Sequence, residues 1–153
     1  MKKIFILFLF VGSLLTSCIK ANLDELPVYN LTGITSFNLE YKFEVKNENN
    51  VSYVSEVNIP CDVTIDNQNS IITVIPTMPS TNSEFTAEEQ AKVTLKKLIG
   101  YCSLETAASI APIGNAPKMG ALGDWSVDNK YKVIAADGKT TREWTVKVIP
   151  FEE

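Results

Sequence analysis

Apolar and polar residues alternate from Phe37 to Val45, which is the pattern of a strand with one face in a protein core. The same period of two runs from Val51 to Ile65 and is interrupted by Pro60. Proline cannot donate a backbone hydrogen bond, so Pro60 marks an edge strand, a bulge or a break between two strands. A short apolar run from Ile71 to Ile75 is a further predicted strand, and Pro76 ends it.

The stretch from Thr86 to Lys97 does not alternate in this way. It begins with Thr86-Ala87-Glu88-Glu89, which has the form of a capping box with Thr86 as the N-cap and Glu89 at the third helical position. One prediction is therefore a short helix over residues 86–97 that ends before Gly100. A strand is the alternative, because the β-branched residues 93–94 disfavour a helix.

The clearest local pattern lies near the C-terminus. Two alternating runs, Tyr131–Ala135 and Trp144–Val148, flank the turn dipeptide Asp137-Gly138. This arrangement is typical of a β-hairpin, and the apolar residues of the two runs would face the core together. The chain as a whole is therefore predicted to be mostly β.

The N-terminus differs in composition from the rest. Lys2 and Lys3 precede an apolar run from Ile4 to Leu15, as in a secretory signal. The segment Leu15-Thr16-Ser17-Cys18 resembles the lipobox of bacterial lipoproteins, which implies cleavage before Cys18 and lipid attachment to that residue. The alternative is an uncleaved membrane anchor, but the run is about a dozen residues long, against the ~20 that span a bilayer. We therefore divide the chain into a signal peptide over residues 1–17, a lipidated tether over 18–33 and one domain over 34–150.

Charge and histidine content exclude several function classes. Without Lys2 and Lys3, 12 basic residues stand against 18 acidic ones, a formal charge of −6. Such an acidic chain repels phosphate backbones, so we expect no nucleic-acid partner. The chain has no histidine, which excludes Ser-His-Asp and Cys-His catalysis and histidine-ligated metals. No cofactor is predicted.

Two cysteines remain once Cys18 carries lipid. Cys61 and Cys102 would be exported to a compartment that permits disulfides. A bond between them would close a loop of about 40 residues and contribute roughly 3–4 kcal/mol in the chain-entropy model. The alternative is two buried free thiols, each packing as a small hydrophobic group.

The C-terminal segments also carry a family resemblance. Residues 131–138 and 142–148 resemble the closing strands of bacterial immunoglobulin-like and cadherin-like sandwiches. Residues 108–112 and 123–126 are similar to Bacteroidetes lipoprotein domains of unknown function, which pair a lipobox with such sandwiches. The resemblance implies an immunoglobulin-like antiparallel β-sandwich. It brings no activity and no catalytic residue.

Carboxylates are the catalytic groups left in a chain without histidine. A glycosidase needs two carboxyl groups across a cleft, and Asp124 with Asp128, or Asp62 with Asp66, are close in sequence. Aspartates in sandwich loops are commonly turn-formers, so we predict no enzyme. Asp124 and Asp128 are alternatively the oxygen ligands of a loose calcium site, although the EF-hand pattern fails at Asn129.

Trp125 is the predicted ligand-contacting residue, because an indole face can stack on the apolar face of a sugar. The alternative places Trp125 in the core, where it would plug one end of the sandwich. Asp124 and Asp128 flank it and complete the candidate ligand site.

Together these patterns predict a non-enzymatic, lipid-anchored binding or accessory module of the cell envelope, with glycan capture as one version. The alternative is a structural or adhesion subunit, like a fimbrial component, that contacts other envelope proteins through its sheet edges. The membrane is the predicted partner through lipid on Cys18, and a glycan or another envelope protein is the second. The predicted location is the outer membrane, on its periplasmic side or at the cell surface; Asp24-Glu25 resembles a surface-export signal but lies later than the usual position.

Overall fold

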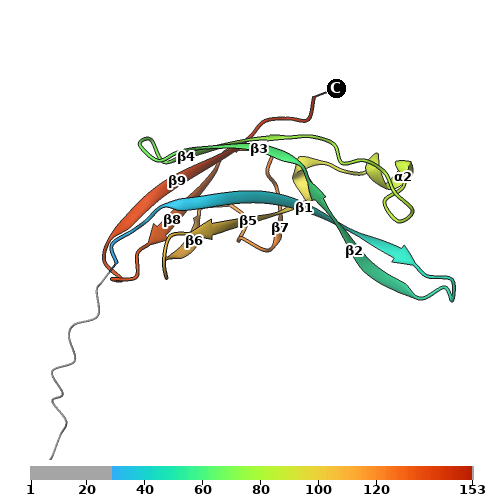
Figure 1. Cartoon of the computed structure of the whole chain (residues 1–153), viewed down its shortest axis with the longest axis horizontal. Coiled ribbons are helices and arrows are strands. Elements are labelled where there is room, and N and C mark those ends of the chain that lie inside the picture. The colour runs from blue at the N-terminus through green and yellow to red at the C-terminus, as the bar shows by residue number, and fades with distance from the viewer. Residues whose placement is uncertain (1–28, 153) are drawn as a thin grey trace, which may run out of the picture.

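A computed structural model describes residues 29–152, and these residues form two facing β-sheets (Figure 1). Sheet A has the strand order β2-β1-β5-β7, and sheet B has the order β3-β4-β9-β8-β6. The strands are β1 Ile34–Lys46, β2 Ser52–Ile59, β3 Cys61–Asp66, β4 Ile71–Pro76, β5 Leu98–Leu104, β6 Ser109–Ile113, β7 Leu122–Gly123, β8 Asn129–Ile134 and β9 Thr141–Val148. The predicted mostly-β sandwich is confirmed.

Pro60 separates two strands that belong to different sheets. β2 pairs with β1 in sheet A, whereas β3 pairs with β4 in sheet B. The Pro60 carbonyl accepts a hydrogen bond from the Thr77 N–H at 2.7 Å, which ties the crossing to the end of β4. Of the three roles the sequence left open for Pro60, the structure selects the break between strands.

Sheet B is mixed, whereas the sequence predicted antiparallel pairing throughout. β4 and β9 run parallel, with Ile72 opposite Val146 and Val74 opposite Val148. Parallel neighbours need a long connection, and the chain between β4 and β9 contains β5 to β8. Alternation along each strand carries no information about this pairing, because it reports which face is buried and not which strand lies alongside.

The C-terminal hairpin forms as predicted. Tyr131 of β8 lies opposite Trp144 of β9, and both side chains are fully buried. The Asp137 carboxylate accepts hydrogen bonds from the Lys139 and Thr140 N–H groups, both at 2.8 Å, and these bonds hold the turn. Residues from both sheets complete the core, among them Leu39, Ile72, Val74, Val133 and Val146.

Residues 86–97 hold two short helical turns and no strand. α2 spans Ala87–Gln90, with Thr86 as its N-cap accepting from the Glu89 N–H at 3.3 Å, so the predicted cap is confirmed. The Glu89 carboxylate instead accepts from the Tyr41 hydroxyl at 2.7 Å. A 3₁₀ turn, η1, spans Leu95–Lys97. The helix that the capping box predicted therefore ends after its first turn, and a separate 3₁₀ turn follows it.

Two further observations bear on the N-terminal prediction. Cys18 and the segment through residue 28 lie outside the described residues, so the lipobox stays a prediction. Within residues 29–152, neither helical segment has the length and hydropathy needed to cross a membrane.

Candidate functional site

Trp125 is a core residue. Its side chain is 0% exposed, and its Nε1 donates to the Leu98 carbonyl at 3.1 Å. The ring meets Phe37 edge-on, with centroids 5.3 Å apart, and stacks on Tyr131 at 6.3 Å. No face of the indole is open to a sugar. The structure therefore corrects the predicted ligand contact and selects the packing alternative.

Gly100 makes room for that indole. The sequence predicted that Gly100 ends a helix, but it lies within β5, opposite Leu39 of β1. A Cβ atom at Gly100 would lie 2.2 Å from Cζ2 of Trp125, well inside the contact distance of two carbon atoms. The absence of a side chain here is thus a packing requirement of the core.

Asp124 and Asp128 have structural partners. The Asp124 Oδ1 accepts from the Ser126 hydroxyl at 2.6 Å and from the Ser126 N–H at 2.8 Å, and these bonds lower the pKa of Asp124. Asp128 forms an ion pair with Lys147 at 3.4 Å. The two carboxylates are therefore used in an Asx turn and an ion pair. Among residues 29–152, no group of three acidic or cysteine side chains gathers into a metal-binding cluster.

Cys61 and Cys102 are free thiols in the structure. Cys61 starts β3 in sheet B, and its thiol donates to the Ile59 carbonyl at 3.2 Å, so its sulfur is directed to its own backbone. Cys102 lies on β5 in sheet A, opposite Phe37. Burial raises the pKa of both thiols to about 11. Of the two alternatives, the structure has the half-buried thiols and not the disulfide.

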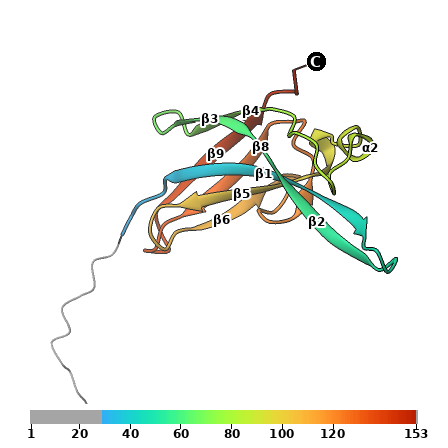
Figure 2. The same cartoon turned by 45° about the vertical axis from the view of Figure 1, so that its right-hand side comes forward.

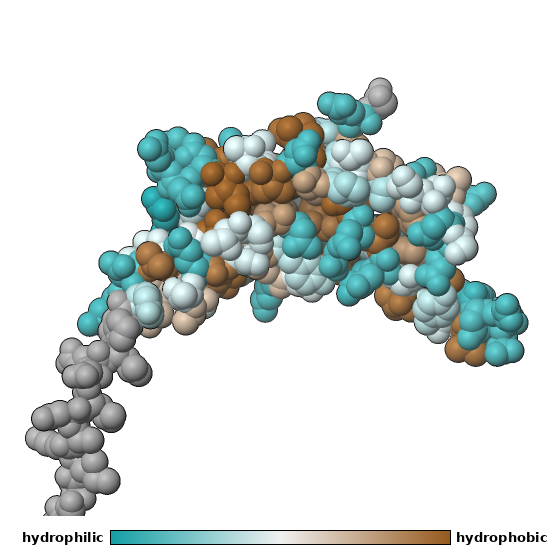
Figure 3. All heavy atoms as spheres, in the orientation of Figure 1, coloured by the Kyte–Doolittle hydropathy of each residue, from teal (hydrophilic) through white to brown (hydrophobic). Residues whose placement is uncertain are grey.

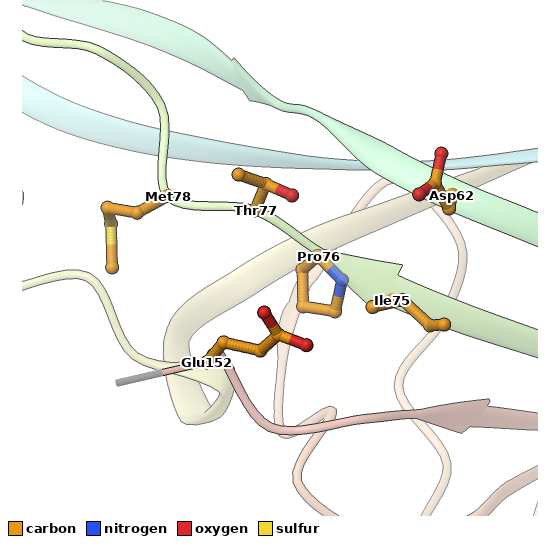
Figure 4. A pocket seen from close by; sticks show the side chains of 6 residues that line it. All are labelled: Asp62, Ile75, Pro76, Thr77, Met78 and Glu152. Atoms are coloured by element: carbon orange, nitrogen blue, oxygen red, sulfur yellow. The ribbon is translucent and has the colours of Figure 1, made fainter.

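An acidic pocket lies on the outer face of sheet B and is the candidate site that the structure adds. It has a volume of about 260 Å³. Its walls come from the start of β3, the end of β4, the loop after β4 and the C-terminal tail (Figure 4). The lining residues are Asp62, Ile75, Pro76, Thr77, Met78 and Glu152.

Backbone hydrogen bonds hold this pocket together. Asp62 lies opposite Ile75 in the β3–β4 ladder, which fixes the carboxylate beside an apolar side chain. The Ile149 N–H donates to the Val74 carbonyl at 2.8 Å and carries the C-terminal tail along β4. Phe151 packs against the core, and the Glu152 carboxylate then points toward Pro76 (Figure 4).

The pocket combines two carboxylates with an apolar floor. Ile75 is 41% exposed and Met78 is 36% exposed, so the floor is open to solvent. This chemistry suits a long basic side chain, whose methylenes pack on apolar surface while its cationic head meets carboxylate. The sequence indicated Asp62 as an acidic loop residue. Nothing in it placed Glu152 nearby, because that placement depends on the parallel pairing of β4 with β9.

Comparisons with known proteins agree with this architecture. A family model described as DUF5018-related matches residues 34–147. The crystal structure of a Bacteroides fragilis NCTC 9343 protein that is described as secreted is similar to this chain, with 34% sequence identity and a TM-score of 0.73. That match covers 83% of this chain and 100% of the other. No curated protein matches the chain.

Proposed function

The chain belongs to the DUF5018-related family, and we propose that it is a lipid-anchored accessory module of the bacterial cell envelope that binds another protein. Its similarity to a Bacteroides protein that is described as secreted supports export. The Leu15–Cys18 segment supports lipid attachment at Cys18. The predicted likeness to immunoglobulin-like and cadherin-like domains agrees with a binding role and is part of this proposal.

One observation carries the choice of a protein partner: the sheet edges on one side of the sandwich are unprotected. Exposed edges are protected in many proteins by short strands or by proline. β7 has two residues, and β6 contains Pro112 in mid-strand. β2 and β3 have eight and six residues and contain no proline. Among the described residues, each of these two strands pairs on one side alone.

The two unprotected edges lie on the same side. β2 and β3 follow one line across β1, as the views in Figures 1 and 2 both show, and Pro60 is the one residue between the two strands. β6 and β7 are the opposite edges of the two sheets. This side of the sandwich therefore offers main-chain groups to an added strand, and the other side does not.

Glycan capture loses its main support, because Trp125 is buried. Tyr53 is 41% exposed, but its hydroxyl donates to Glu84 at 2.8 Å, so its polar end is already occupied. The alternative of a self-assembling adhesion subunit would also use sheet edges, and the same experiment separates it from the proposal.

Site-specific photo-crosslinking in intact cells tests the proposal. A photoreactive amino acid replaces exposed Thr64 on β3, or exposed Ala111 on β6 as the matched control. We expect Thr64 to cross-link to a different protein and Ala111 to give no such product. Cross-links between copies of the chain would favour the adhesion subunit. A chain that gives no protein cross-link but binds one glycan class in an array would contradict the proposal.

The membrane anchor has its own test. We expect the full chain to incorporate an alkyne-labelled fatty acid and to sediment with membranes, whereas Cys18→Ala loses the label and is released. Cys102→Ala is the control, since its thiol is half-buried in the domain. An unlabelled wild-type chain would remove the anchor from the proposal and leave the protein contact standing.

A further inference from the structure

We infer that the β3 edge binds an extended polypeptide segment with apolar residues on one face and a lysine or arginine on the other, the basic side chain entering the Asp62 pocket. The inference rests on the proposed protein-binding function and specifies the chemistry of the partner. Its parts are the open edge of β3, the partly exposed apolar side chains on its inner face and the carboxylates on its outer face.

The inner face of β3 is apolar and incompletely covered. Cys61, Val63 and Ile65 point inward and pack against the core, yet each remains partly exposed, unlike Ile72 and Val74 on neighbouring β4. Figure 3 shows hydrophobic surface between the β3–β4 hairpin and β1 on this side.

The facing sheet is open at the same place. β2 pairs with β1 over Leu39–Lys46 alone, so residues 34–38 of β1 have no hydrogen-bonded strand on that side among the described residues. Both sheets therefore end in free edges beside the apolar inner face of β3. A strand that paired with β3 would direct every second side chain toward this apolar surface and cover it.

The outer face of β3 is acidic. Asp62 and Asp66 flank Thr64, and Asp62 forms no hydrogen bond or ion pair with the described residues. Asp66 is held in its own turn by the Asn69 N–H at 3.0 Å, the Asn69 side-chain amide at 2.7 Å and the Gln68 N–H at 2.9 Å, and these hydrogen bonds lower the pKa of its carboxyl. The Asp66 side chain is therefore a fixed negative charge at neutral pH and not a free ligand.

No basic residue on β3 or β4 offsets this charge. Lys147 on the outer face of β9 is two strands away and is paired with Asp128. Glu152 adds a second carboxylate to the pocket that Asp62 lines (Figure 4). A lysine beside Asp62 could lay its methylenes over Ile75 and place its ammonium group among these carboxylates.

The same charges disfavour a second copy of this chain as the occupant. Antiparallel pairing of two β3 strands centred on Thr64 would place Asp62 of each copy opposite Asp66 of the other. Like charges directly opposite each other destabilise a strand pair. The edge therefore fits a basic partner strand better than it fits itself.

Peptide binding to the full chain in detergent tests the inference. The probes are a peptide of alternating valine and lysine and a matched peptide of alternating valine and glutamate. We expect the lysine peptide to bind at least about tenfold more tightly by fluorescence anisotropy. It should slow amide hydrogen exchange at Val63 and Ile65 and leave Ile110 on β6 unchanged.

Charge reversal at the pocket separates specific from general attraction. Asp62→Lys should weaken binding of the lysine peptide more than about tenfold and strengthen binding of the glutamate peptide. Glu48→Lys makes the same charge reversal in an exposed turn. It should change the affinity for either peptide by no more than about twofold. Asp62→Asn, a milder change, should weaken the lysine peptide by about fivefold.

Equal binding of the two peptides, protection outside β3, or dimerisation of the chain through β3 would overturn the inference. If Thr64 cross-links to a protein in cells but Asp62→Lys changes no binding, the partner chemistry is wrong and the proposed function stands. If no edge cross-links to any protein, the proposed function itself fails.

Discussion

At the scale of single residues, a missing side chain and a buried indole determine how one end of the core packs. Gly100 lies in the middle of β5, a position where glycine costs stability in most strands. Here the indole of Trp125 fills the space beside Gly100. The Nε1 of the same ring donates a hydrogen bond to the carbonyl of Leu98, two residues before Gly100 in β5. The two residues therefore form one packing unit.

Gly100→Ala should lower the free energy of unfolding by about 3 kcal/mol, because the added methyl overlaps the Trp125 ring. Urea unfolding followed by tryptophan fluorescence and circular dichroism measures the loss. Gly114→Ala is the control: its φ of +64° is strained for alanine, but no atom lies within 4 Å of the new Cβ, so it should lose about 1 kcal/mol. Trp125→Phe should reduce the effect of Gly100→Ala, and additive losses would contradict the packing unit.

At the scale of elements, the loop between β4 and β5 covers the hairpin end of sheet A. Phe85 is 0% exposed and lies against Phe43, with ring centroids 5.5 Å apart, and against Tyr41 at 6.3 Å. The Glu84 carboxylate accepts from the hydroxyls of Tyr53 at 2.8 Å and Ser55 at 2.7 Å. One loop thus contributes both a buried aromatic side chain and two hydrogen bonds to the β1–β2 hairpin.

Phe85→Ala should lower the free energy of unfolding by about 3–5 kcal/mol, because it leaves a cavity beside two aromatic rings. Amide hydrogen exchange should become faster in the β1–β2 hairpin before it does so in β8 and β9. Tyr53→Phe removes one exposed hydrogen bond to Glu84 and should lower the free energy of unfolding by no more than about 1.5 kcal/mol. Equal losses in the two variants would show that Phe85 does not anchor the loop.

At the scale of the whole molecule, buried thiols and phenols make stability depend on pH in the alkaline range. Burial raises the pKa of Cys61 and Cys102 from 9.0 to about 11. Burial, with the Glu89 hydrogen bond as the second cause, raises the pKa of Tyr41 from 10.0 to about 12. The folded chain therefore holds these protons more tightly than the unfolded chain. The resulting stability is present in full below about pH 9 and is lost as pH rises through these folded-state values.

We expect the free energy of unfolding to be flat between about pH 7 and 8.5 and to fall by about 2 kcal/mol by pH 11, a value reduced for the partial exposure of the thiols. The double variant Cys61→Ala, Cys102→Ala should have a lower free energy of unfolding at neutral pH, and that free energy should fall less over the same pH range. Urea titrations at fixed ionic strength measure both curves. Parallel curves for the two proteins would assign the alkaline loss to the tyrosines alone.

The strands were predictable because alternation is a local property of the chain. The run from Phe37 to Val45 identified most of β1, and Asp137-Gly138 identified the closing hairpin, since each pattern is read within about ten residues. The helix over residues 86–97 was predictable only at its N-cap. Beyond Gln90 the helix does not continue, and Leu95 is instead buried, with its carbonyl accepting from the Trp125 N–H at 2.8 Å.

The candidate site could not be predicted in the same way. An aspartate followed by a tryptophan, as at Asp124 and Trp125, occurs both in ligand-binding loops and where the tryptophan packs in the core beside an Asx turn. Burial alone distinguishes the two, and burial is a property of the assembled sandwich. Cys61 and Cys102 likewise have a spacing that permits a disulfide, but the directions of their side chains depend on two different sheets.

The sequence by itself determined the β class of this protein, the hairpin turns, and the exclusion of histidine chemistry, because these follow from composition and from short-range periodicity. Only the tertiary structure decided that β4 runs parallel to β9, that Glu152 joins Asp62 in one pocket, and that the unprotected edges of both sheets lie on one side. Each of these depends on which strands become neighbours across long stretches of chain, and a period-two pattern is the same for every choice of neighbour.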